Sequence, residues 1–172
     1  KKELAAEKAK YYRLDAEIEK AESELAGKRR WKEECEGLIR KAEEVYEEAI
    51  QMKQIAAENT EDEAAARKFR SKMDYAFKEG SVKARKFVGK EKYDEAMSGV
   101  HEFSEKWSLL EEAASLGCEE AIVMYAGLLF SDATSGKYTN AEKAEKFKEV
   151  DKLLTQEVTA ANKDALFLKK FL

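Results

Sequence analysis

The chain has 172 residues, with no proline, eight glycines, 40% charged side chains and a formal net charge of −4. A hydrophobic fraction of 44% argues against a disordered chain, and the abundance of Lys, Glu and Ala favours a nearly all-α protein. No apolar run approaches the roughly 18 residues that cross a bilayer.

The first expected element is a helix with a heptad pattern near the N-terminus. The apolar residues at seven-residue spacing, with two more offset by three, are Leu4, Tyr11, Ile18, Leu25, Leu14 and Ala21. This seam is typical of a coiled coil and equally of an antiparallel helical hairpin. Gly27, followed by three basic residues, is the natural helix end and favours the hairpin.

A second apolar stripe, spaced by four and three residues, runs from Trp31 to Ala56. Its phase nearly continues that of the first stripe, so one uninterrupted helix to residue 58 is the alternative to a hairpin. In both cases we expect residues 1–58 to form an N-terminal arm and residues 60–172 to form a helical repeat region.

The middle of the chain is expected to hold two helices and a connector. Thr60 and Glu63 form a T-x-x-E capping box, which predicts a helix that ends at Gly80. Residues 80–89 are the least periodic part and are predicted to be a connector. Residues 90–116 are predicted to form one helix, because apolar residues follow one face throughout.

A joint between two helices is expected around Gly117. The small residues Ala113 and Ala114 allow close helix approach, and glycine adopts the left-handed conformation that closes a helix at little cost. The next helix is expected over 119–131.

Two more helices are predicted toward the C-terminus, one opened by the capping box of Thr139 and Glu142 and one beginning near Asn162. A shift of 44 residues aligns this part with the chain around the joint. The apolar residues that are identical at this shift are Phe103/Phe147, Leu109/Leu153, Leu110/Leu154, Ala121/Ala165 and Leu128/Leu172. The matches fall on core-facing positions and so indicate an internal repeat, the best copy at 96–157 and a partial copy at 158–172.

The run AASLGCEEAIVMYAGLLF resembles the Sel-one-like repeat, a relative of the tetratricopeptide repeat. The positions that match its pattern are Ala113, Ala114, Gly117, Glu120, Ala121, Tyr125 and Gly127. The following NAEKAEKF resembles the family's second helix, with Ala141 and Ala144 as small packing residues. In the next copy Phe171 replaces Gly127 and Ala161 replaces Gly117. The resemblance implies an α-hairpin solenoid that scaffolds protein complexes without catalysis, and a generic helical bundle is the alternative.

The side-chain chemistry shows no enzyme motif. The single histidine, His101, lies on a patterned helix, and Cys35 and Cys118 belong to no Cys/His cluster. No phosphate-binding loop or nucleophile elbow occurs. We therefore expect no catalytic residue, metal or cofactor, and a protein–protein interaction scaffold as the function.

Candidate binding residues fall into two groups. Met124 and Tyr125 are candidates for contact with a partner protein, and the simpler interpretation is that they are core residues. The second group lies in the basic segment 67–92, which holds ten Lys/Arg against three Asp/Glu. Here Lys83, Arg85 and Lys86 are candidate anion-binding residues, so binding to nucleic acid or an anionic membrane surface is the alternative function. The simpler interpretation is a solvated helix face.

Self-association is a further hypothesis. It would use the heptad seam of Leu4, Tyr11, Leu14, Ile18 and Leu25. The chain begins with KKEL in helical pattern, so we expect a soluble piece of a longer protein from which a signal peptide or anchor could have been removed. No compartment is assigned.

Overall fold

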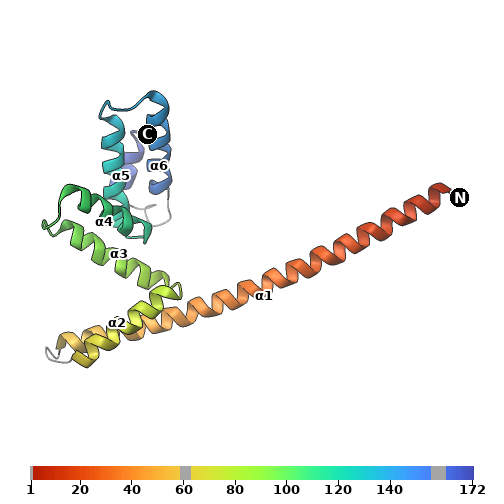
Figure 1. Cartoon of the computed structure of the whole chain (residues 1–172), viewed down its shortest axis with the longest axis horizontal. Coiled ribbons are helices and arrows are strands. Elements are labelled where there is room, and N and C mark those ends of the chain that lie inside the picture. Colours follow the sequence, from red (N-terminus) through yellow and green to blue (C-terminus); the bar gives the residue numbers. More distant parts are fainter. Residues whose placement is uncertain (1, 59–62, 156–161) are drawn as a thin grey trace. The chain divides into compact units, whose positions relative to one another are not determined.

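The structure is a computed structural model that describes residues 2–58, 63–155 and 162–172, with side chains from residue 10 onward and that of residue 8 (Figure 1). All regular elements in these ranges are helices, so the all-α prediction is confirmed. They are α1 (Lys2–Glu58), α2 (Glu63–Lys78), α3 (Val82–Met97), α4 (Phe103–Ser115), α5 (Glu119–Thr134), α6 (Asn140–Leu154) and α7 (Lys163–Lys169). The chain divides into two compact units, Lys1–Glu79 and Gly80–Leu172.

The prediction of an N-terminal hairpin is wrong, because α1 continues through Gly27 as one helix of 57 residues. Nothing lies within 4 Å of a Cβ atom built on Gly27, so no neighbouring element constrains the chain there. A helical glycine costs only about 1 kcal/mol relative to alanine, which strong helix formers on both sides offset. The alternative, an uninterrupted helix to residue 58, is what the structure has.

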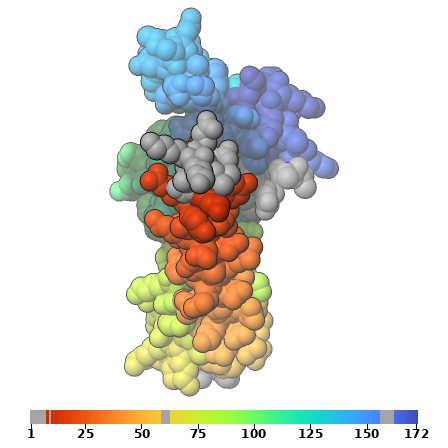
Figure 2. All heavy atoms as spheres, turned by 90° about the vertical axis from the view of Figure 1, so that its right-hand side faces the viewer, coloured from red at the N-terminus to blue at the C-terminus, as the bar shows by residue number. Residues whose placement is uncertain are grey.

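The first unit is formed by α2 lying against the C-terminal part of α1 (Figures 1 and 2). Its buried side chains are mostly alanines, namely Ala42, Ala49, Ala65, Met73 and Ala76. Such small residues let the two helix backbones approach closely. The helix α2 therefore belongs with α1, whereas the sequence placed it at the start of the repeat region. Thr60 lies outside the described residues, so its capping box with Glu63 is not described.

The second unit begins with α3, which replaces the predicted connector at 80–89. The Ser81 hydroxyl caps α3 by accepting a hydrogen bond of 3.0 Å from the Ala84 amide, and Ser81 is fully buried. The single helix predicted over 90–116 is also wrong. The chain leaves α3 after Met97, passes through Gly99 at φ +78°, and re-enters a helix at Phe103.

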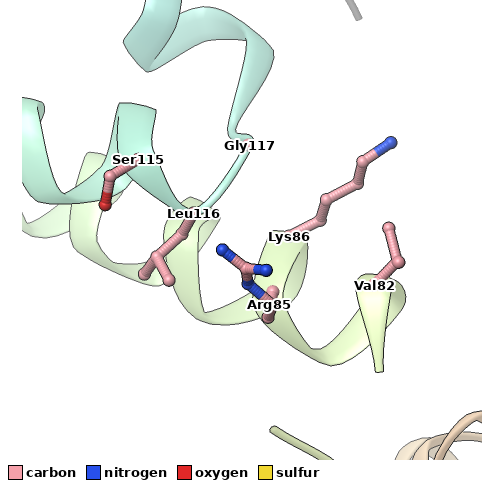
Figure 3. Close-up of a pocket in the computed structure, with 6 residues that line it drawn as sticks. All are labelled: Val82, Arg85, Lys86, Ser115, Leu116 and Gly117. Atoms are coloured by element: carbon pink, nitrogen blue, oxygen red, sulfur yellow. The ribbon is translucent and has the colours of Figure 1, made fainter. Parts of the chain in front are cut away.

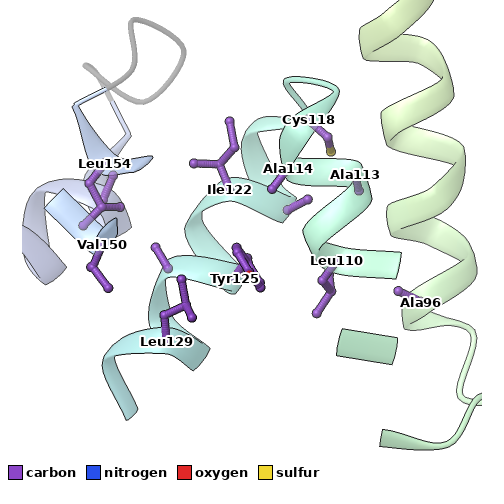
Figure 4. Close-up of a cluster of buried hydrophobic side chains, with 13 residues drawn as sticks. Ala96, Leu110, Ala113, Ala114, Cys118, Ile122, Tyr125, Leu129, Val150 and Leu154 are labelled. Atoms are coloured by element: carbon purple, nitrogen blue, oxygen red, sulfur yellow. The ribbon is translucent and has the colours of Figure 1, made fainter. Parts of the chain in front are cut away.

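Each helix of the second unit packs on the next one along the chain. In addition, α5 contacts both α3 and α7, so two helices that are not its neighbours in the chain also lie against it. The shared core lies around α5, where the largest fully buried apolar side chains are Leu110, Ile122, Val150 and Leu154 (Figure 4). Two sequence predictions are confirmed here: the capping box of Thr139 and Glu142 opens α6, and Asn162 caps α7.

The small residues of α6 do not pack as the family resemblance implied. Ala141 and Ala144 are both exposed. The helix instead buries Val150 and Leu154, and the Phe147 ring lies 5.5 Å from that of Phe130. The inward face of α6 is thus formed by large apolar residues, because these fill the space beside α5.

Candidate functional site

The joint at Gly117 is closed by two backbone hydrogen bonds. Gly117 has a φ of +84°, its amide donates to the Ala114 carbonyl at 3.0 Å, and the Cys118 amide donates to the Ala113 carbonyl at 3.1 Å. This pair of bonds is the Schellman motif, which satisfies carbonyls at a helix C-terminus. The predicted left-handed glycine is therefore confirmed, and it fixes the direction in which α5 leaves α4.

A hollow of about 180 Å³ lies beside this joint, between the N-terminal part of α3 and the end of α4 (Figure 3). Its lining residues are Val82, Arg85, Lys86, Ser115, Leu116 and Gly117. The volume is below the roughly 300–1,000 Å³ of ordinary small-molecule pockets. The hollow is therefore of a size for one side chain or one small anionic group.

The two cations of the hollow, Arg85 and Lys86, make no side-chain ion pair with any residue that the structure describes. Later cations of the same helix are paired: Lys90 lies 3.1 Å from the Glu120 carboxylate, and Lys92 lies 2.8 Å from that of Glu112. The hydrogen bonds to Glu120 and then to Asp94 raise the pKa of Lys90. Paired cations thus tie α3 to its neighbours, whereas Arg85 and Lys86 remain available to a ligand.

The backbone adds to the positive potential at the start of α3. No acidic residue occupies the first turn of α3, so no carboxylate of that turn offsets the positive end of the helix dipole. Figure 3 shows the Arg85 guanidinium directed toward the turn at Leu116, where α4 ends, and the Lys86 side chain extended from the helix.

The basic segment does not form one surface within either unit. Residues 67–78 belong to α2 in the first unit and residues 83–92 to α3 in the second. Of the three predicted anion-binding residues, Arg85 and Lys86 come together at the hollow, whereas Lys83 is exposed on α3 and does not line it. The sequence did not identify Ser115 and Leu116, because they come from a different helix and show no charge pattern.

The predicted partner-binding residues lie in and around the core. Tyr125 is 7% exposed, and its ring meets that of Trp107 edge-on at 6.0 Å. Burial, followed by the nearby charges of Glu111 and Glu149, raises the pKa of its hydroxyl. Tyr125 is thus part of the buried core, where it contacts Trp107 of α4. Met124 is half-buried and keeps part of its side chain accessible.

The remaining residues with potentially reactive side chains are His101, Cys35 and Cys118. His101 lies between α3 and α4, 3.3 Å from Glu105 and 3.5 Å from Glu95. Cys35 and Cys118 are both free thiols, and burial raises the pKa of Cys118. Among the described residues, no group of three His, Cys, Asp or Glu side chains is placed to hold a metal ion.

The class that these observations define is an all-α protein of two units. In the second unit the helices α3 to α7 each contact the next one, and a basic hollow lies at one joint. None of the described helices combines the length and apolar character needed to span a membrane. Comparison with protein-family models, curated proteins and solved structures finds no match for this chain.

Proposed function

We propose that the chain is a non-catalytic protein–protein interaction scaffold whose second unit consists of Sel-like helical repeats. The observation that carries the proposal is the order of packing in this unit. Each helix contacts its successor, and α5 contacts the odd-numbered helices on either side. Nearest-neighbour packing of this kind is typical of α-hairpin repeats, which bind proteins on their extended faces.

The 44-residue shift supports the repeat hypothesis at the level of structure. Both α5 and α7 begin at equivalent positions, Glu119 and Lys163. Leu110 and its equivalent Leu154 are both buried. The two equivalent helix starts are also adjacent, since the Asn162 side-chain amide donates a hydrogen bond of 2.8 Å to the Glu119 carboxylate.

The match is less complete farther along the second copy. Ile122 is fully buried in α5, whereas the equivalent Leu166 in α7 is 48% exposed. This difference is compatible with a repeat, because none of the described helices packs on the far side of α7. The exposed apolar residues of α7 are therefore consistent with the proposed repeat.

The surface proposed for a partner is the hollow between α3 and α4. Two available cations, Arg85 and Lys86, lie beside the apolar side chains of Val82 and Leu116. A segment that combines a carboxylate with an adjacent apolar residue would satisfy both parts of the hollow. The proposed partner is accordingly a protein with an exposed acidic and apolar segment.

A binding experiment with a charge-reversal variant tests this proposal. The probe is a fluorescent peptide of Glu and Leu residues, and its anisotropy is followed as the full chain is added. The variant Arg85→Glu/Lys86→Glu is expected to weaken binding by about tenfold or more, since each lost ion pair becomes a repulsion. The control is Lys68→Glu/Arg70→Glu on α2, with the same charge change in the other half of the basic segment.

The same titration separates the proposal from the alternative function, in which the segment 67–92 binds nucleic acid or an anionic membrane. That function predicts tight binding of labelled DNA, RNA or phosphatidylserine vesicles. The affinity should fall strongly with salt, and both charge-reversal variants should lose binding. Equal effects of the two variants on the peptide, or no peptide binding by the wild type, would contradict the proposal.

A further inference from the structure

A long apolar seam on α1 is left uncovered within the first unit. Only the C-terminal part of α1 lies against α2, where Ala42 and Ala49 are fully buried. Toward the N-terminus the large seam residues are exposed, with Tyr11 at 72%, Leu25 at 49% and Trp31 at 69%. At 1.5 Å per residue, the uncovered part from residue 8 to residue 38 is roughly 45 Å long. Leu4 belongs to the predicted seam, but its side chain lies outside those described.

The spacing of the seam shows what kind of element covers it. Its members alternate by three and four residues: Tyr11, Leu14, Ile18, Ala21, Leu25, Lys28, Trp31, Cys35 and Leu38. There is one irregularity, because the steps from Leu25 to Lys28 and from Lys28 to Trp31 are both three residues. An apolar repeat of 3.5 residues stays in contact with a second helix when the two helices supercoil around each other. One extra three-residue step, as at Lys28, locally tightens that supercoil.

We infer that α1 forms a parallel two-stranded coiled coil with α1 of a second copy of this chain. The inference goes beyond the proposed function, because it concerns the first unit and does not depend on what the second unit binds. A helix of this length that exposes an apolar face gains most of its stability from a packing partner. In register, the two copies place identical seam residues against one another.

Charges beside the seam favour the parallel orientation. In a parallel pair, a residue on one flank faces the residue five positions later on the other copy. Lys10 then faces Asp15 of the second copy, and Glu24 faces Arg29, both attractive pairs. One pair, Glu17 with Glu22, is repulsive.

An antiparallel pair in which Ile18 lies opposite Ala21 has less favourable charges. That arrangement brings Asp15 toward Glu22 and Glu17 toward Glu24, so both flanking pairs are repulsive. Exposed ion pairs contribute little affinity, but they do decide between orientations of similar packing.

Lys28 and Ala21 limit the strength of the dimer. A lysine at one seam position costs stability and favours two strands in register, because its ammonium group reaches water at the side of a two-stranded coil. Ala21 buries little apolar area. The dimer therefore forms reversibly, and its fraction increases with protein concentration.

Sedimentation equilibrium of the full chain over a range of concentrations tests the inference. The expected mass rises from 19.6 kDa toward twice that value. The variant Ile18→Asp/Leu25→Asp is expected to weaken dimerisation by about tenfold or more, since it places like charges in the seam. The control Ala16→Asp/Ser23→Asp adds the same charge on the opposite face of α1 and is expected to leave dimerisation nearly unchanged. Trp107 fluorescence of each variant, measured in a Trp31→Phe background, reports whether its second unit is folded.

A gain-of-affinity variant and a cross-linking experiment complete the test. Ala21→Leu fills a seam position and is expected to tighten the dimer by about tenfold. Ala21→Cys, in a Cys35→Ser background, is expected to form a disulfide between copies on mild oxidation, because parallel strands in register bring position 21 of both copies together.

Four results would overturn the inference. They are a chain that stays monomeric at every concentration, a dimer that both double variants affect equally, an oligomer larger than two, and a dimer without the cross-link at position 21. A monomer that instead captures a different heptad-bearing protein through α1 would likewise assign the seam to another partner.

Discussion

A Cβ atom placed on Gly89 would lie 3.1 Å from the carbonyl oxygen of Ala113, so α3 and α4 approach each other as closely as a glycine allows. The same atom would lie 3.1 Å from the Leu116 Cβ and 3.3 Å from the Cys118 Cβ. These neighbours are the backbone and the first side-chain atoms of the Gly117 joint. Gly89 is therefore the position at which α3 packs on the joint and on the end of the hollow.

Substituting Gly89→Ala is expected to destabilise the second unit by about 1 kcal/mol. Alanine gains about 0.5–1 kcal/mol of helix propensity, but overpacking against atoms that cannot rotate away costs about 1–3 kcal/mol. Urea unfolding followed by Trp107 fluorescence in a Trp31→Phe background measures the change. Gly27→Ala, which has open space around it, is the control and should leave this transition in place. A Gly89→Ala protein as stable as its parent would contradict the close approach.

Substituting Gly117→Ala is expected to cost about 1–2 kcal/mol for a different reason. The nearest atom to an added Cβ is the Lys86 Cγ at 3.8 Å, an ordinary contact, so crowding contributes nothing. The cost arises from the φ of +84°, which residues with a Cβ atom adopt unfavourably. Asparagine tolerates this conformation better, so Gly117→Asn should lose less stability in the same urea experiment. Equal losses for the two variants would point to a cause other than backbone conformation.

Three helix boundaries that the sequence predicted correctly are set by local contacts. At the end of α4, the Gly117 amide bonds a carbonyl three positions earlier and the Cys118 amide bonds one five positions earlier. Thr139 and Glu142 cap each other within one turn. Asn162 caps α7 in the same way, by accepting from the amides of Asp164 and Ala165. Such contacts involve neighbours in the chain, so the order of residues is enough to predict them.

The glycines that were misassigned differ in their tertiary surroundings. Gly27 has no atom of another element near it and remains helical. Gly89 lies within α3, where α4 packs closely against it. Gly99 takes a positive φ in the turn between α3 and α4. Their roles depend on which element lies nearby, and a single sequence does not contain that information. The lining of the hollow could not be predicted in full for the same reason. Charge identified Arg85, but only the fold brings Leu116 to it.

Substituting Tyr125→Ala tests whether this residue is core or surface. Removal of a buried aromatic side chain typically costs about 3–5 kcal/mol, and Tyr125 also loses its edge-on contact with Trp107. Urea unfolding followed by circular dichroism is the suitable measurement, because Trp107 fluorescence responds directly to the loss of this neighbour. Met124→Ala, at a half-buried position, should cost less. Unchanged stability of Tyr125→Ala together with lost peptide binding would restore Tyr125 as a contact residue.

The stability of the second unit is expected to fall in acid, in part through Asp132. The Asp132 carboxylate accepts hydrogen bonds from Lys146 at 2.9 Å and from the Tyr138 hydroxyl at 2.7 Å, which joins the end of α5 to α6. The bond from Lys146, followed by that from Tyr138, lowers the pKa of Asp132 below its ordinary value. A carboxyl group whose pKa is lower in the folded state stabilises that state above its unfolded pKa of about 3.9. The contribution is lost as the pH falls through the folded pKa.

Asp132→Asn should therefore be less stable than the wild type at neutral pH, and the difference should shrink as the pH falls below about 4. Urea unfolding midpoints of the two proteins across this range measure the difference. Asp151→Asn on the exposed face of α6 removes the same charge and is the control, with a small expected change in stability at neutral pH. If the difference between Asp132→Asn and the wild type were the same at neutral and acid pH, the carboxylate would not join α5 to α6 through its charge, and the contact with Tyr138 alone would account for the stability.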